Sequence, residues 1–215
     1  MLNSIVLAGG KSRRLGKPKF MVDLNGKPLI LHVIEKLNTI ASKIIISIKS
    51  NYQKNAIKRV LTNNNFISNK IIFAMDDPKI QGILSGVKSA LLQCNENLAF
   101  ITGCDLPFIS PKTVLWLANN INHYDAIVPL WKNGFIEPLY SIYRVTPTLH
   151  AIEKTLKNNN LSLRGVLNQI SVKYVSAEYL EELANTPIFF NVNSKKDLIE
   201  AEKLLSNEQA SSKSP

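Results

Sequence analysis

A short segment near the start of the chain combines glycines with an unusual density of basic side chains. Since 26 of the 215 residues are Lys or Arg, nine residues would hold about one by composition alone, but positions 11–19 hold five. Glycines let backbone N–H groups approach an anion closely, and Lys and Arg add charge and directed donors. The segment therefore predicts a cradle for a triphosphate. Its residues are Gly9 and Gly10, followed by Lys11, Arg13, Arg14, Lys17 and Lys19.

This loop matches neither of two common phosphate-binding motifs. No Gly-Lys-Ser/Thr closes it, and it lacks the Gly-x-Gly-x-x-Gly spacing. Two alternatives are a solvated basic loop and a nucleic-acid-binding segment. The convergence of glycines and charges at the end of a predicted strand argues against the first. The lack of aromatic side chains between the charges argues against the second.

Asp105 is the second candidate for chemistry. It follows the apolar run 98–102 through Gly103 and Cys104. Mg²⁺ prefers carboxylate together with phosphate oxygens and water, so an aspartate at a strand end is well placed to hold it. An aspartate that caps a turn is an equally good interpretation of this segment alone, and the nearby phosphate loop favours the metal. Cys104 has no histidine neighbour in the sequence, so a thiolate nucleophile is poorly supported.

Three weaker signals lie elsewhere in the chain. Asn191 and Asn193 alternate, so an extended segment would direct both amides to one face, where they can bind phosphate, sugar or metal-bound water. A helix start capped by Asn193 or Ser194 is the alternative that these residues alone favour. Asp76-Asp77-Pro78 is predicted to form a charged turn, and contact with a nucleotide or with the metal is the alternative. The glycines of residues 81–86 mark a helix start, where backbone N–H groups favour a base or a phosphate.

The elements that must position these residues alternate between short β-branched runs and longer helical periods. Such alternation implies a parallel sheet covered on both faces, with ligands at the carboxyl ends of its strands. We expect one α/β domain over residues 1–205, a three-layer α/β/α Rossmann-like structure with a mostly parallel sheet, and a disordered tail over 206–215. Strands are predicted over 3–8, 43–48, 70–74, 98–102, 126–129 and 138–144. Helices are predicted over 28–37, 52–61, 83–92, from 111 behind a Ser110 cap, and over 147–156, 163–169 and 196–205.

Composition excludes several classes of protein. Hydrophobic residues make up 45% and charged residues 20%, which is a globular balance. Two cysteines cannot form a disulfide framework or a four-cysteine zinc site, so we expect a cytoplasmic protein. No apolar run approaches the ~20 residues that cross a bilayer, and the first residues lack a signal peptide pattern. The formal net charge is +10, but no aromatic–basic stripe accompanies it, so we expect neither nucleic acid nor membrane as a partner.

The pattern Leu-Ala-Gly-Gly-x-Ser-x-Arg-x-Gly-x-x-Lys at residues 7–19 resembles the signature of nucleotidyltransferases with a nucleotide-diphosphosugar-transferase fold. Within them, the chain resembles molybdenum cofactor guanylyltransferases, the molybdopterin-guanine dinucleotide biosynthesis protein A family. The similarity spans residues 2–205, because four further segments agree in order and spacing. These are residues 82–86, 103–108, 137–143, and 190–193 followed by Lys196-Asp197-Leu198.

The resemblance implies a role for particular residues of this chain. The catalytic residues would be Arg13, Lys19 and Asp105, with Asp105 as the Mg²⁺ ligand and Lys19 on the phosphates. Asn191 and Asn193 would face the acceptor. The nucleotide would contact Leu7, Ala8, Gly9, Gly10, Lys19, Ser47, Asp76 (or Asp77), Gly82 and Asp105. Two departures bear on guanine specificity more than on the chemistry: Ser47 replaces an expected asparagine, and residues 82–86 read Gly-Ile-Leu-Ser-Gly in place of Gly-Pro-Leu-Ala-Gly.

The activity that the resemblance implies is transfer of GMP from Mg-GTP to the phosphate of molybdopterin, giving molybdopterin guanine dinucleotide and pyrophosphate. The acceptor phosphate is largely ionised at pH 7, because its second pKa is about 6, so no general base is required. Enzymes that make molybdopterin or receive the cofactor are the protein partners to expect. The alternatives are the same chemistry on cobinamide phosphate, a phosphosugar or phospholactate, a CTP-dependent molybdopterin cytidylyltransferase, and a nucleotide-binding protein without catalysis.

Overall fold

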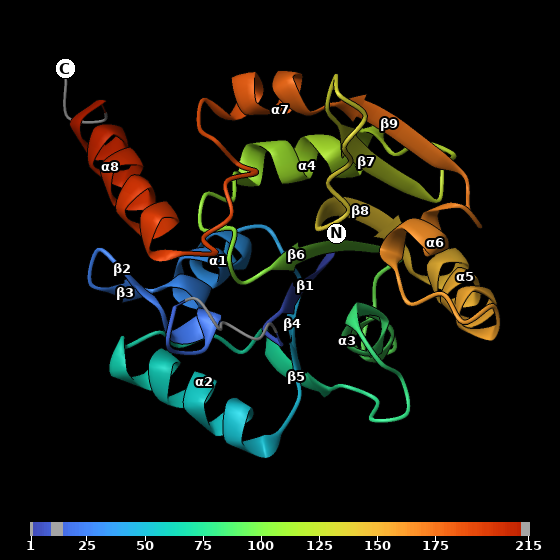
Figure 1. Cartoon of the computed structure of the whole chain (residues 1–215), viewed down its shortest axis with the longest axis horizontal. Coiled ribbons are helices and arrows are strands. Elements are labelled where there is room, and N and C mark those ends of the chain that lie inside the picture. The colour runs from blue at the N-terminus through green and yellow to red at the C-terminus, as the bar shows by residue number, and fades with distance from the viewer. Residues whose placement is uncertain (1, 10–14, 212–215) are drawn as a thin grey trace.

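The structure of the chain is a computed structural model that describes residues 2–9 and 15–211. Within these residues the centre of the molecule is a seven-stranded sheet with the order β5-β4-β1-β6-β8-β7-β9, and helices cover both of its faces (Figure 1). Its strands are β1 (Asn3–Leu7), β4 (Lys43–Ile48), β5 (Ile71–Met75), β6 (Leu98–Gly103), β7 (Ala126–Leu130), β8 (Tyr140–Arg144) and β9 (Val172–Ser176).

The register of the sheet brings the ends of distant segments together. β1 lies between β4 and β6 and runs parallel to both, with Leu7 opposite Ser47 on one side and Gly103 on the other. The loops after these strands therefore begin at one edge. β8 runs antiparallel to its neighbours β6 and β7, whereas the other pairs are parallel. The mostly parallel sheet is confirmed, and its antiparallel strand is an addition that the sequence pattern did not reveal.

The two faces of the sheet carry separate apolar cores, because successive strand residues point to opposite sides. On β4, for example, Ile44 and Ile46 enter one core and Ile45 enters the other. The first core is covered by α1 (Leu29–Asn38), α2 (Asn51–Asn63), α4 (Pro111–Asn120) and α7 (Ala177–Ala184). The second is covered by α3 (Ile83–Leu91), α5 (Val145–Lys157) and α6 (Leu163–Leu167). This arrangement confirms the three-layer α/β/α prediction.

A small third core lies outside the layers. It joins Val22, which follows η1 (Lys19–Met21), and the hairpin of β2 (Asp23–Leu24) and β3 (Lys27–Pro28) to α8 (Lys195–Ser211), with Leu24, Val192 and Ala201 among its buried residues. The hairpin turns at Asn25-Gly26, where both φ angles are positive, at 52° and 75°. Asn-Gly is a strong hairpin signal, so this element was readable from the sequence but was not predicted.

Each predicted strand and helix has a counterpart, with differences at the ends. The Ser110 cap is confirmed, since its Oγ accepts a hydrogen bond from the Thr113 N–H at 3.4 Å. Besides η1 and the β2–β3 hairpin, the prediction missed β9 and α7. β9 lies at the sheet edge with side chains such as Tyr174 at 47% exposure, so it lacks a clear apolar pattern. α8 continues as a helix to Ser211, into the tail expected to be disordered, and residues 212–215 lie outside the described part.

No helix in the described ranges combines the length and the apolar character that a membrane span requires.

Candidate functional site

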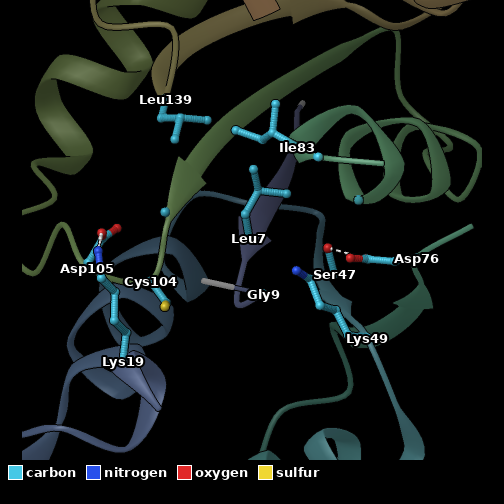
Figure 2. A pocket seen from close by; sticks show the side chains of 13 residues that line it. Leu7, Gly9, Lys19, Ser47, Lys49, Asp76, Ile83, Cys104, Asp105 and Leu139 are labelled. Atoms are coloured by element: carbon cyan, nitrogen blue, oxygen red, sulfur yellow. Dashed lines mark hydrogen bonds and ion pairs between the residues drawn. The ribbon is translucent and has the colours of Figure 1, made fainter. Parts of the chain in front are cut away.

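A pocket of about 310 Å³ opens where β1, β4, β5 and β6 end (Figure 2). Seven of the residues expected at the site line it, although they come from segments far apart in the sequence. The rule that ligands bind at the carboxyl ends of parallel strands accounts for this convergence. The lining residues are Leu7, Gly9, Lys19, Ser47, Lys49, Asp76, Gly82, Ile83, Gly86, Gly103, Cys104, Asp105 and Leu139.

One side of the pocket is formed by Lys19 and Asp105. Lys19 begins η1, and Asp105 follows β6. The Lys19 Nζ lies 2.5 Å from Asp105 Oδ2 and 2.5 Å from Asn193 Oδ1. The loop that carries Asn193 is fixed here by its neighbour, because the Val192 N–H donates to the Asp105 carbonyl at 2.9 Å. One lysine thus connects the predicted metal ligand with a predicted acceptor-side residue.

Ser47 and Asp76 form the opposite side of the pocket, with Leu7 and Gly9 between the two sides in Figure 2. Ser47 Oγ donates to Asp76 Oδ1 at 2.6 Å. Burial raises the pKa of Asp76, while the Ser47 hydrogen bond and the charge of Lys49 oppose that shift. Asp77 does not line the pocket; its Oδ1 accepts from the Lys79 N–H at 2.9 Å in a turn. Of the two aspartates, Asp76 is therefore the one that lines the pocket.

Gly86 of α3 allows the helix to approach this pair. A Cβ atom at position 86 would lie 2.3 Å from Ser47 Oγ and 3.1 Å from Asp76 Oδ1, closer than such atoms can pack. Glycine at this position therefore serves close approach, and its φ angle is helical. Gly86 thus fits α3 against the Ser47–Asp76 side. The predicted contact of backbone N–H groups in residues 82–86 with a base or a phosphate stays a prediction.

The two asparagines of the 190–193 segment do not point to one place. Asn191 Nδ2 donates to the Phe189 carbonyl at 3.1 Å, so only Asn193 reaches Lys19. The helix-start interpretation is confirmed for this segment. The Asp197 carboxylate accepts from the N–H groups of Asn193 and Ser194, both at 2.9 Å, and these bonds lower the pKa of Asp197.

Gln53 is a site-supporting residue that the sequence reasoning missed. It is buried on α2, where its Nε2 donates to the Ala8 carbonyl and its Oε1 accepts from the Lys49 N–H, both at 2.8 Å. The side chain therefore ties the loop after β1 to the end of β4. A signal was available, because a polar residue at position 53 continues the apolar spacing of Ile57, Val60 and Leu61.

Gly10 and Arg13, together with the basic residues 11 and 14, lie outside the described residues. Ala8 is described and is buried below the pocket. Cys104 lines the pocket but is 2% exposed, and burial raises the pKa of its thiol, so it is not a thiolate nucleophile.

The metal-ligating side chains of the pocket suit a metal ion that arrives bound to the phosphates of a substrate. In the described ranges, no group of three or more His, Cys, Asp or Glu side chains could enclose a metal ion. Mg²⁺ commonly uses one or two carboxylates and takes its other ligands from phosphates and water. The Asp105 carboxylate, on the Lys19 side of the pocket, fits that mode of binding, and a preformed protein cage for a tightly held metal does not exist among these residues.

Comparison with solved structures identifies the fold first. The chain superposes on 4-diphosphocytidyl-2C-methyl-D-erythritol synthase from Anaerococcus prevotii with a TM-score of 0.71 at 14% identity, covering 95% of this chain and 96% of that one. The fold is therefore that of nucleotidyltransferases. The model of the MobA-like NTP transferase domain matches residues 4–173, so the chain belongs to this family and is a nucleotidyltransferase.

Two relatives that match more than nine-tenths of this chain carry the same name. A protein from Bacillus cereus named "Probable molybdenum cofactor guanylyltransferase" is 32% identical over 208 residues, which are 95% of this chain and 97% of the relative. A protein of the same name from Methanosarcina mazei is 30% identical and covers 91% of this chain and 88% of its own. The solved molybdopterin-guanine dinucleotide biosynthesis protein A from Archaeoglobus fulgidus has a TM-score of 0.77 at 25% identity, with 95% and 99% covered.

Proposed function

We propose that this nucleotidyltransferase moves GMP from Mg-GTP to the terminal phosphate of molybdopterin. The observation that carries the proposal is the double contact of Lys19 with Asp105 and Asn193. A cation that bridges the nucleotide side and the acceptor side can neutralise two phosphates that must meet. The names of the full-length relatives support the choice of GTP and molybdopterin.

The reaction exchanges one phosphoanhydride bond for another. An oxygen of the acceptor phosphate attacks the α-phosphorus of GTP and forms the new P–O–P bond. The bond from the α-phosphorus to the oxygen that bridges to the β-phosphorus breaks, and pyrophosphate leaves with the electron pair. Because the acceptor phosphate is largely ionised at pH 7, the protein has no proton to remove. Its task is to position the reactants and screen their charges.

Each side of the pocket has its own part in that task. Asp105 would hold Mg²⁺, which when bound screens phosphate charge and favours departure of pyrophosphate. Lys19 contacts the phosphates from the same side. Asp76, held by Ser47, accepts hydrogen bonds from the base; guanine offers two adjacent donors at N1 and N2, which suit a carboxylate. Backbone groups of Leu7, Ala8 and Gly9 approach the nucleotide, and the contribution of Gly10 and Arg13 stays a prediction.

The test is a nucleotide panel with molybdopterin and Mg²⁺, read as pyrophosphate release. GTP should support turnover, and CTP and ATP should not. Asp105→Asn should abolish release while circular dichroism shows a retained fold, and Asp77→Asn, which alters a turn outside the pocket, should behave as wild type. Use of CTP in place of GTP would refute the guanylyl assignment. Full activity of Asp105→Asn would refute Asp105 as the Mg²⁺ ligand, and binding of GTP without pyrophosphate release would favour a nucleotide-binding protein without catalysis.

A further inference from the structure

A second pocket, of about 570 Å³, opens beyond the end of β7. β7 is parallel to β6 across the antiparallel β8, so Trp131, which follows β7, emerges at the same sheet edge as Asp105. We name this site the aromatic–acidic pocket. Its lining holds four aromatic rings, those of Trp131, Phe135, Phe189 and Phe190, and the two carboxylates of Glu137 and Glu181. The lining, as far as the structure describes it, includes no lysine or arginine.

The aromatic rings form a supported surface. Phe189 is packed edge-on between Trp131 and Tyr140, at centroid distances of 5.4 Å and 5.1 Å. Phe190 packs against Phe108 at 6.0 Å. Phe135 is 67% exposed at the pocket, which is unusual for a phenylalanine. Aromatic walls of this kind accept a flat ring by stacking.

The two carboxylates are acceptors without a cationic partner. Glu137 Oε1 accepts from Trp131 Nε1 at 2.8 Å, and no ion pair within the described ranges joins Glu137 or Glu181 to a lysine or arginine. Burial raises the pKa of both groups, and the charge of Glu137 adds to the shift at Glu181. Two half-buried carboxylates in a chain of net charge +10 do not suit a phosphate. They suit a ligand group that donates hydrogen bonds.

Two short segments of chain connect the aromatic–acidic pocket with the Lys19 side of the nucleotide pocket. Glu137 lines the former and Leu139 lines the latter, so their Cα atoms are at most ~7 Å apart along the chain. Phe190 and Asn193, which contacts Lys19, are separated by at most ~11 Å in the same way. A molecule that places its ring in the second pocket can therefore extend a phosphate toward Lys19.

We propose that the aromatic–acidic pocket is the subsite for the heterocycle of the acceptor. It takes a flat ring with adjacent N–H donors, such as the 2-amino-4-oxopyrimidine edge of a pterin, which stacks on the aromatic walls and donates to Glu137. The inference deepens the proposed function, because it rests on an acceptor whose phosphate reacts in the nucleotide pocket. A lysine or arginine side chain from a partner protein is the competing occupant, since it can form cation–π contacts with the rings and ion pairs with the carboxylates.

The experiment titrates 6-hydroxymethylpterin, which has no phosphate, into the full chain without nucleotide and follows quenching of tryptophan fluorescence. Glu137→Gln keeps the side-chain shape and Phe135→Ala removes an exposed ring, so both variants should fold. Each should weaken pterin binding by about tenfold or more. GTP affinity, measured in parallel, should stay within about twofold. Glu182→Gln is the matched control, because Glu182 is the exposed neighbour of Glu181 on α7.

The outcomes separate this inference from the proposed function. Absence of pterin binding to a wild-type protein that binds GTP overturns the inference, as does equal pterin affinity in all variants. If arginine amide displaces the pterin at a concentration below the one at which the pterin half-saturates the protein, a basic side chain of a partner protein is the better occupant and the inference is overturned. Specific pterin binding without GTP-dependent pyrophosphate release would uphold the subsite and refute the guanylyl transfer.

Discussion

Lys19 Nζ and Asp105 Oδ2 are 2.5 Å apart, although 86 positions separate the two residues in the chain. Their side chains are 16% and 17% exposed, so the pair is largely shielded from water. The carboxylate that the proposed function assigns to Mg²⁺ is therefore already paired with a cation of the protein. Mg²⁺ must compete with Lys19 for Asp105, and a lysine that gives up this carboxylate is available to the phosphates.

Replacement of Lys19 by methionine should make Mg²⁺ a stronger stabiliser. The variant leaves Asp105 without its cationic partner, so Mg²⁺ alone should raise the Tm by several degrees more in Lys19→Met than in the wild type. Pyrophosphate release should fall by at least about 100-fold, since a charge that screens the transferring phosphates is lost. Thermal melts with and without Mg²⁺, together with the turnover assay, measure both effects.

Lys27→Met is the control for this prediction. Lys27 also pairs with a carboxylate, Glu35, at 2.7 Å, but both side chains are more than a third exposed and lie outside the pocket. This variant should show the Mg²⁺ response and turnover of the wild type. An equal Mg²⁺ response in Lys19→Met and in the wild type would contradict competition at Asp105.

Asp76→Asn should stabilise the protein at pH 7 and weaken its binding of GTP. Burial raises the pKa of Asp76 above its ordinary value of 3.8, so between 3.8 and the raised value the folded chain binds more protons than the unfolded chain. Stability therefore falls as pH rises through this window, and the charged form is a liability at pH 7. The neutral amide should raise the Tm at pH 7 and give little gain near pH 4. GTP affinity should fall by about tenfold or more.

The corresponding control is Asp77→Asn, which removes the same charge one residue away. Its melting curve should depend on pH as that of the wild type does, and its GTP affinity should be unchanged. A lower Tm for Asp76→Asn at pH 7 would show that Ser47 and Lys49 outweigh the cost of burying this carboxylate.

The sequence allowed much of the nucleotide pocket to be predicted, because its geometry follows from few rules. Leu7, Ser47 and Asp105 each stand at or just after a predicted strand, and parallel strands align those ends at one edge. Each of these residues was therefore predicted from its own segment, and the pairing of the strands brings the residues together in the pocket. For Asn191 and Asn193 the residues alone favoured a helix start, which the structure shows, whereas the extended segment with both amides on one face is not found.

The rest depended on contacts that no local pattern encodes. Gln53 acts through Ala8, 45 positions away, and only the packing of α2 on the sheet reveals the bond. The aromatic–acidic pocket forms because β8 runs antiparallel to β6 and β7, which brings the segment before Tyr140 to the edge where Trp131 emerges. Strand direction was not predictable from the composition of residues 138–144, since a buried strand has the same apolar character in either direction.

Gly86→Ala should impair nucleotide binding through Ser47. The new methyl group would meet Ser47 Oγ at 2.3 Å, so the serine must rotate and release Asp76. GTP affinity should fall by about tenfold, whereas the helix gains up to about 1 kcal/mol from replacing glycine. A double-mutant cycle with Ser47→Ala tests the cause, because Gly86→Ala should do less harm where the serine hydroxyl is already gone. Strict additivity of the two changes in binding free energy would reject it.

Gln53→Leu should destabilise the protein and loosen the nucleotide pocket together. The leucine fits the buried site by size but leaves the Ala8 carbonyl and the Lys49 N–H without this partner, at about 1–3 kcal/mol each. At ~2–4 °C per kcal/mol for a chain of this length, the Tm should fall measurably. GTP affinity should fall as well, because the Ala8 carbonyl anchors the loop between Leu7 and Gly9.

Gln93→Leu, at an exposed position, is the control and should change neither the Tm nor the GTP affinity. Gln53→Glu keeps an acceptor for Lys49 but faces Ala8 with an oxygen, so GTP binding should weaken in this variant too. A loss of stability with unchanged GTP affinity in both variants would make Gln53 a core residue without influence on the site.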